Sequence, residues 1–200
     1  MTKTLSIKKE RQITSLFFLL YGFGGTSWLP RFPDIKENLG ISIGQFGSLI
    51  SLVTIGCIIS FISVGHVVHR FGTFRSFLVL VSILYSTFVA IVHCHSPSLF
   101  ALLMVILGFA QSGFHIAANA QAFDTQERAG AVHITGWHGM WSGGATLAAL
   151  SGIALVNRVS VETHITIVAL MVCAGKLWIV FKQRATLLQP GDGEDSIINV

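Results

Sequence analysis

Long segments without Asp, Glu, Lys or Arg make up most of this chain. A helix that crosses the hydrocarbon core of a bilayer needs about 20 mostly apolar residues, so the segment at 76–123 is too long for one crossing. It divides at His93-Cys-His-Ser-Pro97, the polar, proline-containing patch within it. The pattern therefore predicts six membrane-spanning helices, near residues 13–30, 44–67, 75–92, 98–122, 134–156 and 163–181.

Polar segments flank the predicted bundle of residues 13–181. Residues 1–12 are basic and are expected in the cytoplasm, and residues 182–200 form a polar tail that is predicted to be disordered. The basic start followed by an apolar core at 13–21 also fits a cleaved signal peptide. We prefer an uncleaved first helix, because five further spans follow against which it would pack.

Composition excludes an ordinary soluble domain. The 200 residues are 52% hydrophobic and only 11% charged, whereas soluble domains carry about 25% charged residues. The same apolar excess, with 15 Phe, excludes a disordered chain. The three cysteines lie in apolar runs without Cys-x-x-Cys spacing, so they predict neither a disulfide framework nor a zinc site.

The formal net charge of +4 is interpreted as a sign of membrane orientation rather than of nucleic-acid binding. With the N-terminus inside, nine Lys and Arg residues fall on the inner side and three on the outer side. Positive residues favour the cytoplasmic side, so both termini are predicted to be cytoplasmic. Lys176 falls inside the last span near its inner end, where its side chain is expected to snorkel to the interface.

The fourth predicted span carries a polar stripe. Gln111, His115 and Asn119 recur every four residues and so share one side of a helix. Lipid cannot satisfy such groups, so they should face the bundle interior or a wet cavity. Two hypotheses remain open: these side chains bind a substrate, or they form hydrogen bonds that join helices.

The fifth span adds His138, Trp141 and Ser142. His138 could couple transport to protons, since histidine titrates near neutrality, or it could make a structural hydrogen bond. Trp137 and Trp141 could stack on a sugar-like ring of a substrate, or they could anchor the helix at the inner interface, a role that suits Trp137 better than Trp141. In the first span, Tyr21 and Phe23 fall near mid-membrane and are further candidates for lining a cavity.

The outer end of the first span holds Arg31 and Asp34 beside two prolines. These charges either pair and gate the outer mouth, or are solvated charges at a helix stop. The eight histidines include no adjacent pair, and no Gly-x-Ser-x-Gly or phosphate-binding glycine loop occurs. The sequence therefore predicts no enzyme, no cofactor and no metal site.

One loop resembles a known family. The segment Gly65-His-Val-Val-His69-Arg70-Phe-Gly72-Thr-Phe-Arg75 resembles the cytoplasmic signature loop of the major facilitator superfamily, Gly-x-x-x-Asp-Arg-x-Gly followed by basic residues. Gly65 should allow close helix approach and Gly72 a tight turn, with Arg70 and Arg75 on the inner face. His69 replaces the acid that helps to latch the two halves in the family, so the resemblance does not extend to that latch.

A second resemblance covers roughly residues 10–180 and points to the bacterial YbjJ-like subgroup of the superfamily. It rests on Ser27-Trp-Leu-Pro-Arg-Phe-Pro-Asp-Ile35, Asn119-Ala-Gln121 and His138-Gly-Met-Trp-Ser-Gly-Gly144. The resemblance implies a bacterial inner-membrane transporter with twelve spans in two halves, of which this chain would be the N-terminal half. It also implies alternating access and, in outline, a sugar-like substrate.

A weak internal similarity suggests two three-helix units. Gly22-Phe-Gly-Gly-Thr-Ser-Trp28 resembles Gly108-Phe-Ala-Gln-Ser-Gly-Phe114, and Gly44-x-x-Gly47 resembles Gly136-x-x-Gly139. The predicted fold class is therefore an all-α integral membrane protein with six transmembrane helices as a 3+3 repeat, half of the superfamily fold.

Transport of a small solute is the predicted function. The predicted partners are the lipid bilayer, a small-molecule substrate, and either a second six-span half or a second copy of the chain; no nucleic acid is expected. Two alternatives stay open: a truncated remnant that inserts but transports nothing, and a membrane interaction or assembly protein.

Overall fold

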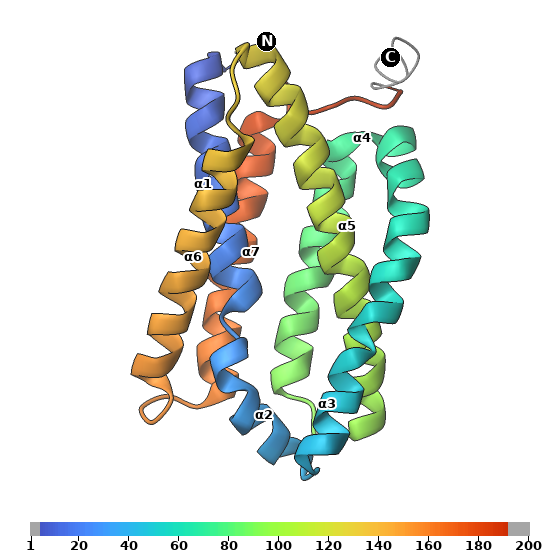
Figure 1. The fold of residues 1–200 in the computed structure, drawn as a ribbon, viewed down its shortest axis with the longest axis vertical. Helices are drawn as coiled ribbons and strands as arrows, with labels where there is room; N and C mark the ends of the chain where they lie inside the picture. The colour runs from blue at the N-terminus through green and yellow to red at the C-terminus, as the bar shows by residue number, and fades with distance from the viewer. Residues whose placement is uncertain (1–4, 192–200) are drawn as a thin grey trace.

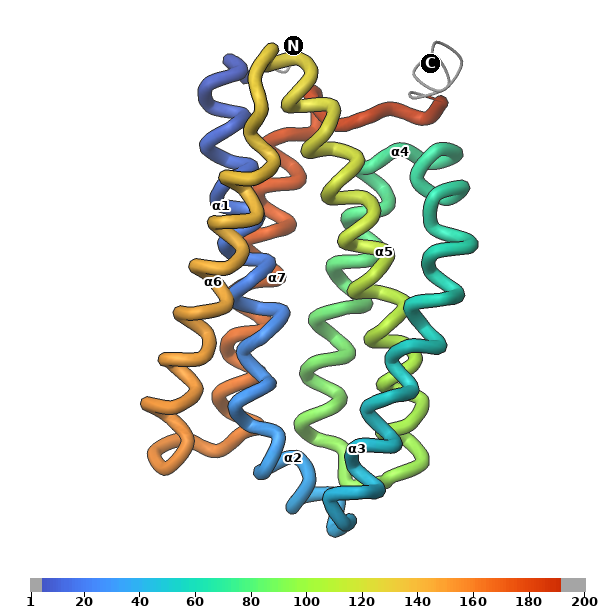
Figure 2. The backbone as a smooth tube through the Cα atoms, viewed as in Figure 1, coloured from blue at the N-terminus to red at the C-terminus, as the bar shows by residue number. Residues whose placement is uncertain are grey.

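The computed structural model describes residues 5–191, and the regular structure within that range is all helical. The long helices lie side by side along one axis, as Figures 1 and 2 show. In chain order the elements are α1 (Ile7–Thr26), the 3-10 helix η1 (Leu29–Arg31), α2 (Phe32–Leu39), α3 (Ile43–Ser51), α4 (Val53–Val92), α5 (Pro97–Ala129), α6 (Ile134–Leu155) and α7 (Val161–Gln183).

Helix α4 is a hairpin of two antiparallel limbs. Gly72 separates residues 53–71 from residues 73–92 with φ 76° and ψ 165°, values that are not helical. The tube in Figure 2 doubles back at this point. Such a backbone conformation is open almost only to glycine, so the tight turn predicted at Gly72 is confirmed.

The connections gather at two ends of the molecule. The Gly72 turn, the link from α5 to α6, the start of α1 and the end of α7 lie at one end, called here the Gly72 end (Figure 1). The opposite end holds η1, α2, residues 93–96 and residues 156–160, and is called the Arg31 end. Residues 5 and 191, the first and last described, therefore lie at the same end.

Local sequence signals set several helix ends. Ser42 begins α3 with a capping box, because its hydroxyl accepts from the Gln45 N–H and its own N–H donates to the Gln45 side chain. Ser96 caps α5 ahead of Pro97. Gly130 ends the same helix in the left-handed conformation, with φ 64°.

Three helical stretches of the described chain are long and apolar enough to cross a membrane: Ile43–Val92, Pro97–Ala129 and Val161–Gln183. The first includes both limbs of the α4 hairpin. Helix α1 is not among them, because its first turns carry charged residues. Helix α6 is not among them either, because Gly, Ser and Thr lower its mean hydropathy. Length and composition of the described helices thus identify three candidate stretches and do not by themselves establish six crossings.

Helices α1 and α6 pack with their backbones in close contact. A Cβ atom on Gly22 would overlap the Trp141 carbonyl, and one on Gly144 would overlap the Leu19 carbonyl. Small residues permit this approach in membrane helices. The pair α4 and α5 makes the same kind of contact, through Gly56 and Gly108.

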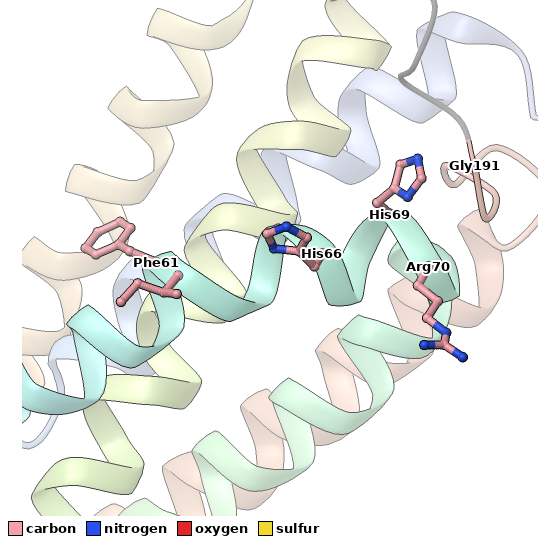
Figure 3. Close-up of a pocket in the computed structure, with 7 residues that line it drawn as sticks. Phe61, His66, His69, Arg70 and Gly191 are labelled. Atoms are coloured by element: carbon pink, nitrogen blue, oxygen red, sulfur yellow. The ribbon is translucent and has the colours of Figure 1, made fainter.

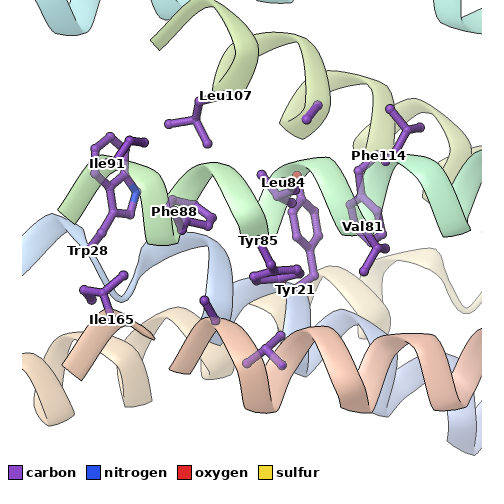
Figure 4. Close-up of a cluster of buried hydrophobic side chains, with 14 of the residues drawn as sticks. Tyr21, Trp28, Val81, Leu84, Tyr85, Phe88, Ile91, Leu107, Phe114 and Ile165 are labelled. Atoms are coloured by element: carbon purple, nitrogen blue, oxygen red, sulfur yellow. The ribbon is translucent and has the colours of Figure 1, made fainter. Parts of the chain in front are cut away.

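A buried aromatic core fills the space between α1, the second limb of α4, α5 and α7 (Figure 4). In this core Phe77 of α4 packs against Phe114 of α5, and Tyr85 packs against Phe88 on the same limb of α4. The core therefore joins the two close helix pairs into one bundle.

The segment after α7 is packed against the Gly72 end, where the sequence predicts a disordered tail from residue 182. The Leu188 carbonyl accepts from the Thr73 N–H at 3.0 Å, and the Leu188 N–H donates to Gln121 Oε1 at 2.9 Å. Gln121 also donates to the Thr186 carbonyl, and Leu187 is buried. Residues 184–191 are named here the strap; the rest of the predicted tail lies outside the described residues.

Candidate substrate-cavity face

Four predicted site residues from three helices meet on one side of the bundle. The Tyr21 ring lies 5.9 Å from the His115 ring and 6.4 Å from Trp141, between centroids. The His115 and His138 rings are 6.3 Å apart. Together with Ser142, one turn after His138, they form what is called here the cavity face.

Polar groups of the cavity face are open rather than enclosed by this chain. His115, His138 and Ser142 are exposed, and Trp141 is half-buried. Tyr21 is buried and forms the floor between the face and the aromatic core.

The polar stripe of α5 lies along the same side. Gln111 and Asn119 are half-buried, one turn before and one turn after exposed His115. Asn119 donates to the His115 carbonyl at 3.0 Å, and the Ser142 hydroxyl donates to the His138 carbonyl at 3.2 Å. Both hydrogen bonds stay on their own helix, so neither joins two helices in the way that the structural hypothesis requires.

Two other aromatic candidates have different surroundings. Phe23 is half-buried and packs against the aromatic core. Trp137, one turn before Trp141, is buried against Phe18, with ring centroids 6.3 Å apart. The interface-anchoring role considered for this tryptophan therefore does not describe its packing.

The signature loop lines an open pocket at the Gly72 end (Figure 3). Gly65, His69 and Arg70 are among the lining residues, with Gly191 of the strap beside His69. The Gly191 N–H donates to the His69 carbonyl at 2.9 Å.

The prediction that Gly65 allows close helix approach is wrong within this chain, because a Cβ atom at that position would meet nothing within 4 Å. Arg70 and Arg75 are exposed at the Gly72 end, and the Arg70 guanidinium lies 5.6 Å from the Phe71 ring.

Lys176 is buried, and the snorkelling predicted for it is wrong. Its side chain is 0% exposed, and the amine Nζ has no hydrogen-bond partner. Nζ lies 3.7 Å from the centroid of the Phe114 ring and 4.7 Å from that of Tyr21. The position of Lys176 near the end of a span could not predict this burial, because the surrounding rings belong to other helices.

A buried arginine organises the Arg31 end. Arg31 is 1% exposed; it donates to Asp34 at 2.9 Å and to the Val159 carbonyl at 3.0 Å. Its Nη1 lies 3.4 Å from Nδ1 of His164, which is also buried. The hypothesis of solvated charges at a helix stop is therefore wrong for Arg31, which ties η1 to α7 through its contact with His164.

A buried acid organises the Gly72 end. Glu10 of α1 is 1% exposed and forms a bidentate ion pair with Arg128 of α5. Thr125 donates to the same carboxylate at 3.1 Å, and Gln183 of α7 donates to Thr14 at 3.2 Å. Sequence reasoning missed Glu10, because no spacing along the chain indicates a partner 118 residues away.

Apolar helices in a close-packed bundle, with a polar face that the bundle leaves open, are typical of a membrane transporter. The chain belongs to the Major Facilitator Superfamily, whose sequence family matches residues 14–197. The superfamily consists of membrane transporters, so the chain is a multi-pass membrane protein and not an enzyme.

Two curated relatives are similar over most of the chain. An uncharacterized transporter, y4wD, of Sinorhizobium fredii is 26% identical over 156 residues, which are 78% of this chain and 41% of that protein. An uncharacterized MFS-type transporter of Yersinia pestis is 25% identical over 136 residues, 68% of this chain and 35% of that protein. The match thus spans well under half the length of either relative.

Proposed function

We propose that this chain is the N-terminal six-span half of a secondary transporter that moves a small solute by alternating access. The cavity face is the observation that carries the proposal. Exposed His115, His138 and Ser142 stand on otherwise apolar helices, and lipid cannot satisfy such groups. A water-filled passage against this face supplies the polar surroundings that these side chains need.

The glycine contacts support the 3+3 arrangement. Gly22 of α1 meets the α6 backbone, and Gly108 of α5, 86 residues later, meets the first limb of α4. Gly56 of that limb meets the α5 backbone, and Gly144 of α6, 88 residues later, meets α1.

Even the contacted atoms correspond in the two helix pairs. Gly144 faces the Leu19 carbonyl and the Phe23 amide, while Gly56 faces the Val105 carbonyl and the Phe109 amide. Each of these partners is shifted by the same 86 residues. Two three-helix units related by an inverted repeat explain this correspondence.

A second six-span unit is proposed to cover the cavity face. Gly65 and Gly139 each have nothing within 4 Å of a built Cβ, although small residues in membrane helices serve close packing. The exposed side chains of Phe61 and Ile62 lie one turn before Gly65. The partner is a separate second half or a second copy of this chain.

The proposed location is the bacterial inner membrane with both termini in the cytoplasm. The distribution of Lys and Arg favours the Gly72 end as the cytoplasmic end. Residues 5 and 191 both lie at that end, in agreement with an even number of crossings.

Side-specific thiol labelling tests alternating access without a known substrate. Ser142→Cys is placed in a chain whose three native cysteines are replaced by alanine, and a membrane-impermeant thiosulfonate is added to intact spheroplasts or to inverted vesicles. Cys-labelling at position 142 is expected from both sides, because the face opens alternately to each. Leu170→Cys, an exposed apolar position on α7, is the matched control that faces lipid and should stay unlabelled. Labelling of position 142 from neither side would contradict a wet cavity.

A further inference from the structure

Lys176 is a buried lysine for which the described chain supplies no hydrogen-bond acceptor. Its Nζ has three donors, and none of them has a partner. Arg31, the other fully buried basic side chain in residues 5–191, is satisfied by Asp34 and the Val159 carbonyl. Lys176 and Arg31 are therefore buried to a similar extent, but only Arg31 has hydrogen-bond acceptors.

Four aromatic rings surround the Lys176 amine. They belong to Phe17 and Tyr21 of α1, Tyr85 of α4 and Phe114 of α5, at 3.7 to 5.5 Å from Nζ. Ring faces attract a cation, but they do not replace the strong acceptor that a buried ammonium requires. The four rings, called here the cage, therefore surround the amine, but they supply no hydrogen-bond acceptor and no negative charge.

The sequence near Lys176 carries no negative charge that could neutralise it. Residues 11–33, 38–123, 129–161 and 163–191 contain no Asp or Glu, so every acid of the described chain lies at a helix end. The other titratable groups around the amine and on the cavity face are Tyr21, Tyr85, Cys173, His115 and His138, and none of them is a carboxylic acid. A protonated Lys176 amine would therefore attract an anion from outside the chain.

One side chain separates the cage from the cavity face. The Tyr21 ring lies 4.7 Å from Lys176 Nζ on one side and 5.9 Å from the His115 ring on the other, as centroid distances. Figure 4 shows Tyr21 beside Tyr85 in the core between the helices. A change in the Tyr21 rotamer is the movement that binding at the amine from the open face requires.

We propose that Lys176 is the group that recognises the acidic end of the solute, and that the substrate class is a small organic acid. The carboxylate would be bound by the Lys176 ammonium, in a charge-assisted contact, while its apolar part packs against Tyr21 and Phe114. This inference rests on the proposed transport function and replaces a sugar-like substrate with an anionic one.

Ligand-dependent thermal unfolding of the purified full chain tests the inference. The probes are sodium acetate, benzoate and succinate, each compared with its uncharged amide, with glucose, and with sodium chloride at the same ionic strength. A ligand that binds only the folded state raises the unfolding temperature. We expect at least one carboxylate to raise it, and the matching amide, glucose and chloride to leave it unchanged.

Two variants assign the effect to Lys176. Lys176→Met removes an unpaired buried charge and fills the same volume, so it should fold at least as well as the wild type, and it should lose the carboxylate-dependent shift. Lys182→Met, at an exposed lysine of the same helix, should keep the shift.

Three results would overturn the inference: no shift with any carboxylate, an equal shift in Lys176→Met, or stabilisation by glucose in both wild type and Lys176→Met. The last result would leave the transport proposal standing and remove only the anionic substrate. Loss of side-specific labelling at position 142 would instead remove the transport proposal itself.

Discussion

Glu10 and Lys176 are buried charges with opposite surroundings. Glu10 is neutralised by Arg128 and accepts a further hydrogen bond from Thr125. The Lys176 amine lies among aromatic rings and has no hydrogen-bond partner in the described chain. Removing Arg128 would leave the Glu10 carboxylate buried without its partner, whereas removing the Lys176 amine would leave no unpaired charge behind.

Arg128→Met should therefore destabilise the bundle by about 1–3 kcal/mol, because it strands the Glu10 carboxylate; the figure is below that for a fully buried pair, since Arg128 is partly exposed. The measurement is chemical or thermal unfolding in detergent. Arg158→Met, at an exposed position in the connection from α6 to α7, serves as the control. Equal stability of the two variants would show that the Glu10 ion pair does not support the fold.

Gly22→Ala should destabilise the bundle by about 1–3 kcal/mol, because the added methyl group overlaps the Trp141 carbonyl and forces α1 away from α6. Gly139→Ala adds the same atom to α6 where nothing lies within 4 Å. Its expected change is within about 0.5 kcal/mol. Unfolding curves of the two purified variants, compared with the wild type, decide between them.

Sequence reasoning finds those residues whose chemistry conflicts with their surroundings in the sequence. His115 and His138 stand out in apolar segments, and the structure brings them together with Tyr21. The burial of Arg31 and Lys176 could not be predicted, since each depends on groups from distant helices. Spacing within one helix carries no information on such partners.

At the scale of elements, the Gly72 turn and the strap depend on each other. The backbone at Gly72 has φ 76°, and a Cβ atom there would lie 2.9 Å from the Leu188 carbonyl. The adjacent Thr73 N–H donates to that same carbonyl. The hairpin of α4 therefore provides the surface on which the strap packs.

Gly72→Ala should lower the stability by about 1–3 kcal/mol, through backbone strain and the clash with the strap. Gly65→Ala lies one turn before the signature loop's His69 in a helical, open position, where alanine is tolerated. We expect the melting temperature to fall in Gly72→Ala and to stay at the wild-type value in Gly65→Ala. Similar melting temperatures for both variants would argue against the turn.

Gln121→Leu should release the strap, because Gln121 accepts from the Leu188 N–H and donates to the Thr186 carbonyl. The expected result is faster tryptic cleavage after Arg184 in purified protein. Gln12→Leu, at an exposed site of α1, should leave the cleavage rate unchanged. Unchanged cleavage in Gln121→Leu would mean that other contacts hold the strap.

The approximate positions of the long helices could be predicted from the apolar segments, but α2 and the charged ends of α1 and α5 could not, because they lie outside those segments. The hairpin was predictable from the apolar segments as well, with Gly72 at the turn of a signature-like loop. The strap was not, since residues 184–191 mix polar and apolar residues without a helical or strand pattern, and their hydrogen bonds run to Gln121 and Thr73 on other helices. Composition therefore predicts disorder where long-range hydrogen bonds impose order.

At the scale of the whole molecule, this chain leaves the cavity face open. The cavity face and the open glycines at 65 and 139 belong to α1, α4, α5 and α6, while α7 packs behind them. The match covers 41% and 35% of the lengths of the two relatives. A second unit of similar size would enclose the cavity face between two bundles, as alternating access requires.

The native mass of the tagged chain, extracted gently from its own membrane, tests this account most directly. A complex of two chains, or of one chain with a second six-span protein, is the predicted result. That complex should also be required for labelling at position 142 from both sides. A stable, lone 21.6 kDa monomer would leave the cavity face open to lipid and would contradict the account.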